Sequence, residues 1–558
     1  MNVAEYVAQC LIEQKVRHVF GYTGGAILKL VDEMMATGAI TYVQNYHEQA
    51  SAFAADAYAR VTGNLGVAMA TSGPGATNLI TGIANAQFDS IPTLFITGQD
   101  YVANATRGNG ARQNGFQDLD IVSVVKPLTK YAVMVIDPSR IRFEMEKCLY
   151  LAKSGRPGAV VLDIPIDVQF KDIDPSQLKG FAPPPEETLP AFDTAEALQL
   201  MREAKRPVIL VGGGVRVAQA VPELRALTAR THIPVVGTVN GIDAIEGSYG
   251  FAGLHGNTHA NLAVQNADVL FAFGVRFGQR QAGKKPREYT QAKVVHVDID
   301  PFELGRIFPD ELAIRADLPI FLRALLAESE TLAFPDHQAW HAQIASWNDR
   351  YRSNAYMNQD GLDPVIATEA LMQLLDDDAI ITNDVGQNQM WVSQGFSARD
   401  QRRLLNSCGL GSMGYSLPAS IGAAMAFPDR QIIACTGDGG LQMNVQELMF
   451  IGHRQVPIKC VVFNNNTLGM MREVQKRYYQ EHYYGANRED FACVDLEKLA
   501  AAYRIDYRCI DRYDQIADLK ACLKNDRPVM IDLRIPYDSK LSNRYDEAPD
   551  FERERLRA

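Results

Sequence analysis

Long hydrophobic runs are absent from this sequence of 558 residues. No segment approaches the ~18–20 uninterrupted apolar residues that a membrane-spanning helix needs. Residues 1–14 also lack the basic start, apolar stretch and small-residue cleavage site of a secretory signal, and instead follow the pattern of an amphipathic helix. We therefore expect no membrane partner and a cytoplasmic location.

An excess of positive charge is also missing, because the formal net charge is −11. Proteins that bind the phosphate backbone of nucleic acids present a basic face. The composition therefore predicts that nucleic acid is not a partner.

Cysteine motifs are missing as well. The eight cysteines include no CxxC pair and no histidine-flanked metal spacing, and most lie in apolar runs such as 432–435. We expect small buried hydrophobic side chains in a reducing compartment rather than disulfides or a zinc site.

The sequence does contain many short apolar runs, each followed by a glycine-rich turn. Such runs are typical of parallel strands that are buried on both faces. Examples are 65–70, 93–97, 207–211, 269–273 and 432–436. Since one core seldom exceeds ~250–300 residues, the chain is predicted to be an α/β protein with three doubly wound parallel-sheet domains.

The predicted domains are separated by segments of linker composition, such as the proline-rich stretch before residue 190. The predicted boundaries are 1–172 for the first domain, 173–190 for a linker, 191–332 for the central domain, 333–362 for a second linker, 363–538 for the third domain and 539–558 for a tail. The sequence leaves open whether that tail is a solvated end or a lid over a site.

The clearest chemical signal is Gly437-Asp438-Gly439, which follows one predicted strand, with Asn464-Asn465 following the next. A Gly-Asp-Gly turn frees backbone N–H groups to face a phosphate, and its carboxylate can hold Mg²⁺. The Asn amide oxygen supplies a second hard ligand. The two turns together predict a site for Mg²⁺ and a diphosphate.

Further motifs extend over nearly the whole chain, and with them the sequence resembles the thiamine-diphosphate enzymes, in particular the acetolactate synthase group of decarboxylase-carboligases. The segments that carry the resemblance are 20–26, 47–50, 71–78, 115–117, 154–158, 274–277, 384–387, 409–414 and 437–470. The resemblance implies that the first domain binds the aminopyrimidine of thiamine diphosphate, the third binds the diphosphate, and the central one carries FAD. It implies decarboxylation of pyruvate or another 2-oxo acid, followed by transfer of the two-carbon unit to an acceptor carbonyl.

The resemblance also implies a role for particular residues. Glu48, at the start of an alanine-rich predicted helix, would be the catalytic acid hydrogen-bonded to the pyrimidine N1′. Met413 would bend the cofactor into a V, and Gly411 would accept a hydrogen bond from its 4′-amine. The implied metal ligands are Asp438, Asn465 and the backbone oxygen of Thr467. The other implied cofactor contacts are Pro74, Asn78, Gly386, Gln387, Asn388, Gly439, Gly440, Gly469 and Met470.

The implied flavin and substrate contacts complete the set. FAD would contact Arg156, Gly212, Gly213, Gly214, Thr238, Leu254, His255, Gly274, Arg276, Asp298 and Ile299. Substrates would contact Gly25, Ala26, Phe116, Gln117, Arg280 and Val474. Because the implied reaction has no redox step, FAD would have a structural role. The family also implies a homodimer or homotetramer with sites at subunit interfaces.

Some positions depart from the synthase pattern. Val474 stands where the synthases have a tryptophan, which leaves room for a bulkier acceptor. The sequence therefore keeps two alternatives open beside an acetolactate synthase-like carboligase. One is pyruvate-dependent acetyl transfer to a larger ketone, such as a keto sugar or a diketone. The other is a catalytically silent regulatory homologue, against which the retained Glu48, Asp438 and Asn465 argue.

Overall fold

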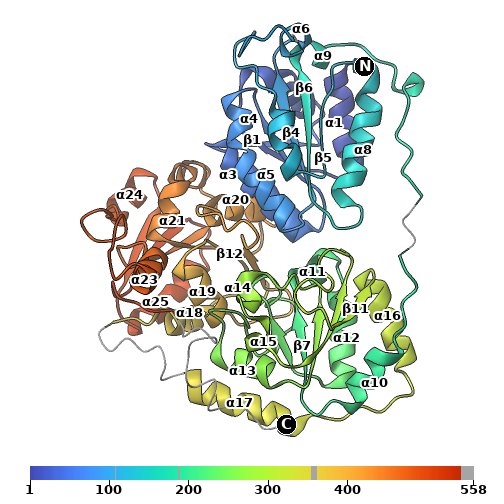
Figure 1. Cartoon of the computed structure of the whole chain (residues 1–558). Coiled ribbons are helices and arrows are strands. Elements are labelled where there is room, and N and C mark those ends of the chain that lie inside the picture. The colour runs from blue at the N-terminus through green and yellow to red at the C-terminus, as the bar shows by residue number, and fades with distance from the viewer. Residues whose placement is uncertain (107, 186–188, 353–360, 542–558) are drawn as a thin grey trace.

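Three parallel β-sheets, each covered by helices, form three lobes (Figure 1). The computed structural model describes residues 1–106, 108–185, 189–352 and 361–541, apart from the side chain of residue 352. All strand pairs within these sheets are parallel. The predicted fold class of three doubly wound α/β domains is confirmed.

The first sheet has six strands in the order β2-β1-β3-β4-β6-β5. Its strands are β1 (His18–Gly21), β2 (Thr41–Gln44), β3 (Gly66–Ala70), β4 (Thr93–Gln99), β5 (Tyr131–Met134) and β6 (Ala159–Pro165). Its helices are α1 (Val3–Glu13), α2 (Leu28–Ala36), α3 (Glu48–Thr62), α4 (Pro74–Asn78), α5 (Ile80–Phe88), α6 (Val102–Ala105), α7 (Ile121–Val125), α8 (Ile141–Lys153) and α9 (Ile166–Gln169), with short 3-10 turns at 25–27, 126–128, 138–140 and 175–177.

The central sheet has five strands in the order β11-β10-β9-β7-β8. These are β7 (Pro207–Val211), β8 (Val235–Gly237), β9 (Val269–Phe273), β10 (Lys293–Asp298) and β11 (Leu312–Arg315). The surrounding helices are α10 (Ala195–Glu203), α11 (Gly213–Val217), α12 (Val221–Thr231), α13 (Thr258–Asn266), α14 (Gln279–Ala282), α15 (Pro286–Tyr289), α16 (Leu318–Glu328) and α17 (Gln338–Arg352).

Helix α17 corrects the prediction of a linker over 333–362. Trp340, Ile344 and Trp347 of this helix are buried in the central domain together with α13 residues. The three side chains recur at spacings of three and four, which places them on one helix face. Much of the predicted linker is therefore a packed helix of the central domain.

The third sheet has the order β13-β12-β14-β15-β17-β16. Its strands are β12 (Ile380–Asn383), β13 (Arg403–Asn406), β14 (Ile432–Gly437), β15 (Lys459–Asn464), β16 (Asp506–Ile510) and β17 (Val529–Arg534). Its helices are α18 (Pro364–Met372), α19 (Gln387–Gly395), α20 (Ser416–Ala426), α21 (Asp438–Met443), α22 (Leu448–Arg454), α23 (Gly469–Tyr478), α24 (Leu496–Ala502) and α25 (Asp514–Leu523), with a 3-10 turn at 445–447. The predicted tail lies outside the described residues from 542 onward.

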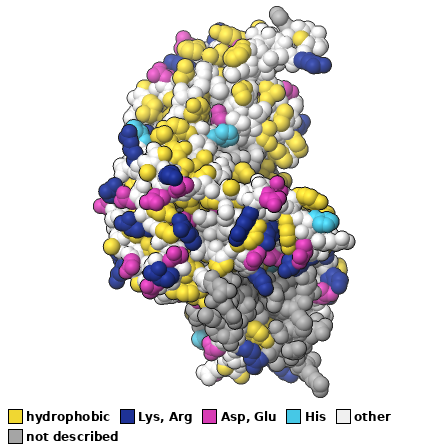
Figure 2. All heavy atoms as spheres, turned by 90° about the vertical axis from the view of Figure 1, so that its left-hand side faces the viewer, with side chains coloured by type: hydrophobic (Ala, Val, Ile, Leu, Met, Phe, Trp, Pro, Cys, Tyr) yellow, Lys and Arg dark blue, Asp and Glu magenta, His cyan; other side chains and the backbone are white. Residues whose placement is uncertain are grey.

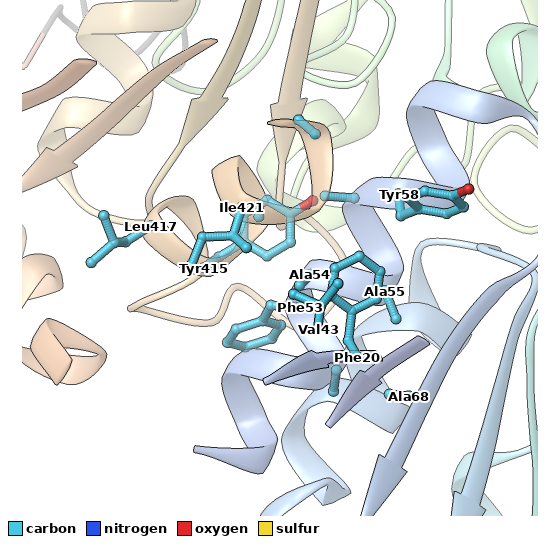
Figure 3. Close-up of a cluster of buried hydrophobic side chains, with 14 of the residues drawn as sticks. Phe20, Val43, Phe53, Ala54, Ala55, Tyr58, Ala68, Tyr415, Leu417 and Ile421 are labelled. Atoms are coloured by element: carbon cyan, nitrogen blue, oxygen red, sulfur yellow. The ribbon is translucent and has the colours of Figure 1, made fainter. Parts of the chain in front are cut away.

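Helices α3 and α20 join the first and third domains through one hydrophobic core. Figure 3 shows Phe53, Ala54 and Ala55 of α3 beside Tyr415 and Ile421 at α20. The helices are so close that a Cβ at Gly422 would lie 2.0 Å from the backbone oxygen of Ala54. The small side chains of α3 therefore fix its position against the third domain.

No helix in the described ranges is both long and apolar enough to cross a membrane.

The eight cysteines are all free; Cys408, Cys493 and Cys509 are partly exposed and the other five are buried.

Candidate functional site

Helix α3 places Glu48 in a buried position at the carboxyl edge of the first sheet. Glu48 is the first residue of the helix and only 6% exposed. Its Oε2 accepts a hydrogen bond of 2.9 Å from Nδ2 of Asn78, at the end of α4. Gly75 leaves room for this carboxylate, because a Cβ there would lie 3.1 Å from Glu48 Oε1. The structure thus brings together Glu48, Asn78 and the α4 turn that Pro74 begins.

Gln117 also lies against the turn at Gly73, directly before α4. A Cβ at Gly73, which has a φ of 59°, would lie 2.8 Å from the backbone oxygen of Gln117. The neighbouring Phe116 is 85% exposed. Gly25 and Ala26 lie in the 3-10 turn after β1, and the Ala26 N–H donates to Thr71 Oγ1 at 3.1 Å.

Glu447 of the third domain holds the segment that precedes Glu48, and we did not predict its role. Its carboxylate accepts hydrogen bonds from Asn45 Nδ2 at 2.9 Å and from the Tyr46 N–H at 2.8 Å. Burial raises the pKa of Glu447 to about 7, although these donors lower it. No local pattern marks Glu447, because its partners lie about 400 positions earlier in the chain.

Asp438 lies at the carboxyl edge of the third sheet, where β14 ends and α21 begins. It is 3% exposed, and its Oδ1 accepts the Gly439 N–H at 2.7 Å. Its Oδ2 is buried without a hydrogen-bond partner. Burial raises the pKa of Asp438 to about 6, although the nearby backbone N–H groups of Gly439 and of residues 465–467 lower it. A buried carboxylate oxygen with no donor is costly unless a cation or a proton neutralises it.

Asn465 follows β15, the neighbour of β14 in the sheet, so the two predicted metal-binding turns lie side by side. Its Nδ2 donates to Gln387 Oε1 at 3.2 Å, while Thr467 Oγ1 donates to the backbone oxygen of Ala486 at 2.5 Å. Gly469 lies directly against Gln387. A side chain at position 469 would collide with it, since a Cβ there would lie 1.8 Å from Gln387 Oε1. In the described residues, this turn included, no three His, Cys, Asp or Glu side chains gather to hold a metal ion.

The remaining predicted diphosphate contacts lie around the turn between β14 and α21 that carries Asp438. Gly386 has a φ of 148°, and Asn388 Nδ2 donates to the backbone oxygen of Asp384 at 2.8 Å. A Cβ at Gly439 would lie 3.5 Å from Met413 Cε, and one at Gly440 would lie 2.9 Å from Asp384 Cγ. Met470 is partly buried against the core of the third domain.

Asp384 fixes the loop that carries Gly411 and Met413. Its carboxylate accepts the N–H groups of Gly414 at 2.8 Å and Ser416 at 3.2 Å. Burial raises the pKa of Asp384 to about 7. Gly411 has a φ of 73° and open space beside its Cα, as a close approach of a ligand to the backbone requires. The sequence motif 384–387 pointed to this region but not to the role of Asp384.

A cavity of about 550 Å³ lies at the carboxyl ends of β7, β9 and β10 in the central domain. Nine of the eleven predicted flavin contacts line it, and Leu254 and His255 lie outside its lining. Arg156 is held there by Asp300 at 2.7 Å and by Ser90 Oγ at 2.8 Å. Burial raises the pKa of Asp298.

Arg280 and Val474 were predicted as substrate contacts, but the structure does not place them beside Glu48. Arg280 lines the same cavity, and its Nη1 donates to Gln389 Oε1 of the third domain at 3.0 Å. Val474 lies on α23 and is 37% exposed.

Comparison with known proteins agrees with this geometry. Three family models match the chain: the N-terminal TPP binding domain of thiamine pyrophosphate enzymes over residues 1–124, their central domain over 194–325 and their C-terminal TPP binding domain over 384–533. TPP, thiamine pyrophosphate, is the same compound as thiamine diphosphate.

Curated relatives cover nearly the whole chain. The acetolactate synthase isozyme 2 large subunit of Escherichia coli (strain K12) is 39% identical over 96% of both chains. The acetolactate synthase large subunit of Parasynechococcus marenigrum (strain WH8102) is 38% identical over 95% of this chain and 87% of its own. Acetolactate synthase 2, chloroplastic, of Nicotiana tabacum is 37% identical over 96% of this chain and 82% of its own. On these matches and on its three-sheet architecture, the chain belongs to the thiamine pyrophosphate enzyme family and, within it, to the acetolactate synthase group.

Proposed function

We propose that this enzyme decarboxylates pyruvate and transfers the resulting two-carbon unit to an acceptor carbonyl, with Glu48 as its catalytic acid. One observation supports the proposal most directly. Two buried carboxylates, Glu48 in the first domain and Asp438 in the third, lie at the carboxyl ends of strands, where a helix begins. Release of CO₂ from pyruvate that depends on thiamine diphosphate and Mg²⁺ tests the proposal. A chain that binds both and releases none would be the silent regulatory homologue.

The residues around Asp438 fit a divalent cation. The unpartnered Asp438 Oδ2 offers a charged oxygen, and the hydrogen bond from Asn465 Nδ2 to Gln387 leaves the Asn465 amide oxygen available. With the backbone oxygen of Thr467, these are the hard ligands that Mg²⁺ prefers. The amides of Gly439 and Gly440 at the start of α21 would face the diphosphate.

Bound thiamine diphosphate supplies a carbon nucleophile and an electron sink for the electrons released with CO₂. Glu48 would share a proton with the pyrimidine N1′, and the Asn78 hydrogen bond orients its carboxylate for that contact. Met413 and Gly411 would hold the bent cofactor, while Phe116 and Gln117 would line the substrate pocket.

We propose that the central cavity binds FAD. Its lining has four basic side chains and four carboxylates, and the arginines among them suit a diphosphate; these residues are Lys153, Arg156, Arg276, Arg280, Asp89, Asp298, Glu303 and Asp317. Gly212 and Gly274 approach so closely that a Cβ at Gly212 would lie 1.8 Å from the Gly274 oxygen, which keeps this wall free of side chains. Because the reaction has no redox step, the flavin would have a structural role.

We further propose that the active site forms between two copies of this chain. Neither the central cavity nor the smaller one between the central and third domains is lined by Glu48 or Asp438. Tyr22 and Tyr46, at the ends of neighbouring strands β1 and β2, are 41% and 39% exposed, and Met443 is 55% exposed. Figure 2, which views the molecule from the left-hand side of Figure 1, shows hydrophobic side chains gathered on the upper part, where the first domain lies. A second copy would cover such a surface.

Mixed subunits test this arrangement. When a Glu48→Gln chain and an Asp438→Ala chain are unfolded and refolded together, hybrids are expected to regain part of the activity, because one site of each hybrid then has both intact residues. Activity of the mixture is compared with that of each variant refolded alone. An active monomer by light scattering would contradict the proposal.

We propose that Val474, which stands where the synthases have a tryptophan, leaves room for a bulky ketone as acceptor. Val474→Trp is expected to leave CO₂ release from pyruvate largely intact and to lower transfer to bulky acceptors about tenfold or more, equivalent to ~1.4 kcal/mol. Product ratios for small and large ketones are measured by mass spectrometry. Equal losses with both acceptors would show that Val474 does not select the acceptor.

A further inference from the structure

Asp89 joins three parts of the molecule that lie far apart in sequence. It follows α5, and its side chain is 5% exposed. Its carboxylate accepts hydrogen bonds from Arg60 Nη2 of α3 at 2.8 Å, and from the N–H groups of Cys408 at 3.0 Å and Gly409 at 2.7 Å. One carboxylate thus links the helix that begins with Glu48 to the loop 407–414, which carries Gly411 and Met413.

A second chain of hydrogen bonds runs parallel to the first. Asp56 of α3 accepts from Asn85 Nδ2 at 3.3 Å, and Asn85 Oδ1 accepts from Ser407 Oγ at 2.5 Å. Ser407 Oγ in turn accepts the Ser412 N–H at 2.9 Å. Ser412 lies between Gly411 and Met413, so the loop is tied to α3 and α5 at two places.

Several residues of this hydrogen-bond network also line the central cavity. Phe88, Asp89 and Ser90 line it from the first domain, and Cys408 and Gly409 line it from the third. The Asp89 side chain is already only 5% exposed, and a molecule that fills this cavity would exclude the remaining water from it. Hydrogen bonds to a carboxylate are stronger where the local dielectric is low and water does not compete.

We propose that Asp89 is a positioning residue through which flavin in the central cavity holds the loop 407–414 in place for the thiamine site. This inference rests on the proposed function of both sites. It gives the flavin a role that needs no electron transfer: its presence strengthens the bonds from Asp89 to the Cys408 and Gly409 amides. The loop then presents Gly411 and Met413 in one fixed geometry.

Amide hydrogen exchange of the loop tests the proposal without relying on catalysis. Peptides that contain Cys408 and Gly409 are followed by mass spectrometry in the full chain, with and without FAD, and flavin binding is followed by its fluorescence. In the parent, FAD is expected to slow exchange of these amides about tenfold or more. In Asp89→Asn, exchange is expected to be fast and the same with and without FAD, because the charge that holds both amides is gone.

Glu144→Gln is the matched control. Glu144 is another side chain that is 5% exposed in the first domain; it pairs with Arg140 and accepts from Tyr131, and it touches neither the loop nor the cavity. This variant should retain the flavin-dependent protection, and thermal unfolding of both variants shows that they fold.

A second measurement connects the loop to the thiamine site. At saturating cofactors, deuterium exchange at the C2 position of bound thiamine diphosphate is expected to be at least tenfold slower in Asp89→Asn than in the parent. Unchanged loop exchange in Asp89→Asn, or flavin binding to the parent without loop protection, overturns the inference. A parent that shows flavin-dependent protection but releases no CO₂ from pyruvate instead overturns the proposed function and leaves the loop result standing.

Discussion

Replacing Glu48 with glutamine is expected to lower turnover ~10²–10⁴-fold, the usual contribution of a general acid or base. Glutamine preserves the side-chain volume and an oxygen that can accept the Asn78 hydrogen bond. It cannot share a proton with the pyrimidine N1′. Thiamine diphosphate should therefore still bind, while deuterium exchange at its C2 position slows by a factor similar to that of turnover.

Quenched-flow exchange followed by NMR isolates this step from decarboxylation and transfer. Asn78→Asp offers a comparison at the same contact, because it places a second carboxylate beside Glu48 and leaves the acid itself in place. If bound cofactor exchanges as fast in Glu48→Gln as in the parent, Glu48 is not the activating acid.

Removal of the Asp438 carboxylate is expected to have the second large effect. Loss of groups that only orient metal ligands typically costs ~10–100-fold in metal affinity or activity, so Asp438→Ala, which removes a ligand itself, should weaken Mg²⁺-dependent binding of thiamine diphosphate at least ~100-fold. Calorimetric titration with Mg²⁺ present measures this loss. EDTA treatment of the parent followed by dialysis should likewise release the cofactor.

Asp363→Asn serves as the control for that variant. Asp363 is 2% exposed in the same domain and caps α18 through the Val365 N–H at 2.9 Å, and asparagine is an equally good cap. Its cofactor affinity should match that of the parent. Full activity after exhaustive chelation would contradict a metal site at Asp438.

Much of the fold could be predicted because short apolar runs in the sequence mark most of its strands. The apolar runs at 207–211, 269–273 and 432–436 became β7, β9 and β14, each buried. The prediction of thiamine diphosphate is confirmed by the family models. Asp438 and Asn465 could be paired in advance, because each follows a strand and adjacent parallel strands end at one edge.

The parts that escaped prediction depend on contacts between distant residues. Asp89 and Gly409 are 320 positions apart, and Asn45 and Glu447 are 402 apart. No spacing or periodicity relates such residues; they meet because the first and third domains pack together, chiefly through α3 and α20. Helix α17 was missed for another reason, since its polar composition resembles that of a linker although Trp340 and Trp347 are buried.

The central claim is that the acetyl carbons of pyruvate reach a ketone acceptor. The most direct measurement incubates the enzyme with Mg²⁺, thiamine diphosphate, FAD and pyruvate labelled with ¹³C at carbons 2 and 3, together with a panel of 2-oxo acids, diketones and keto sugars. Mass spectrometry and NMR should find the labelled acetyl unit, with its C2–C3 bond intact, joined through C2 to the carbonyl carbon of an acceptor, with loss of the unlabelled carboxylate as CO₂. Label recovered only in unreacted pyruvate, or only in free acetaldehyde, would contradict the account.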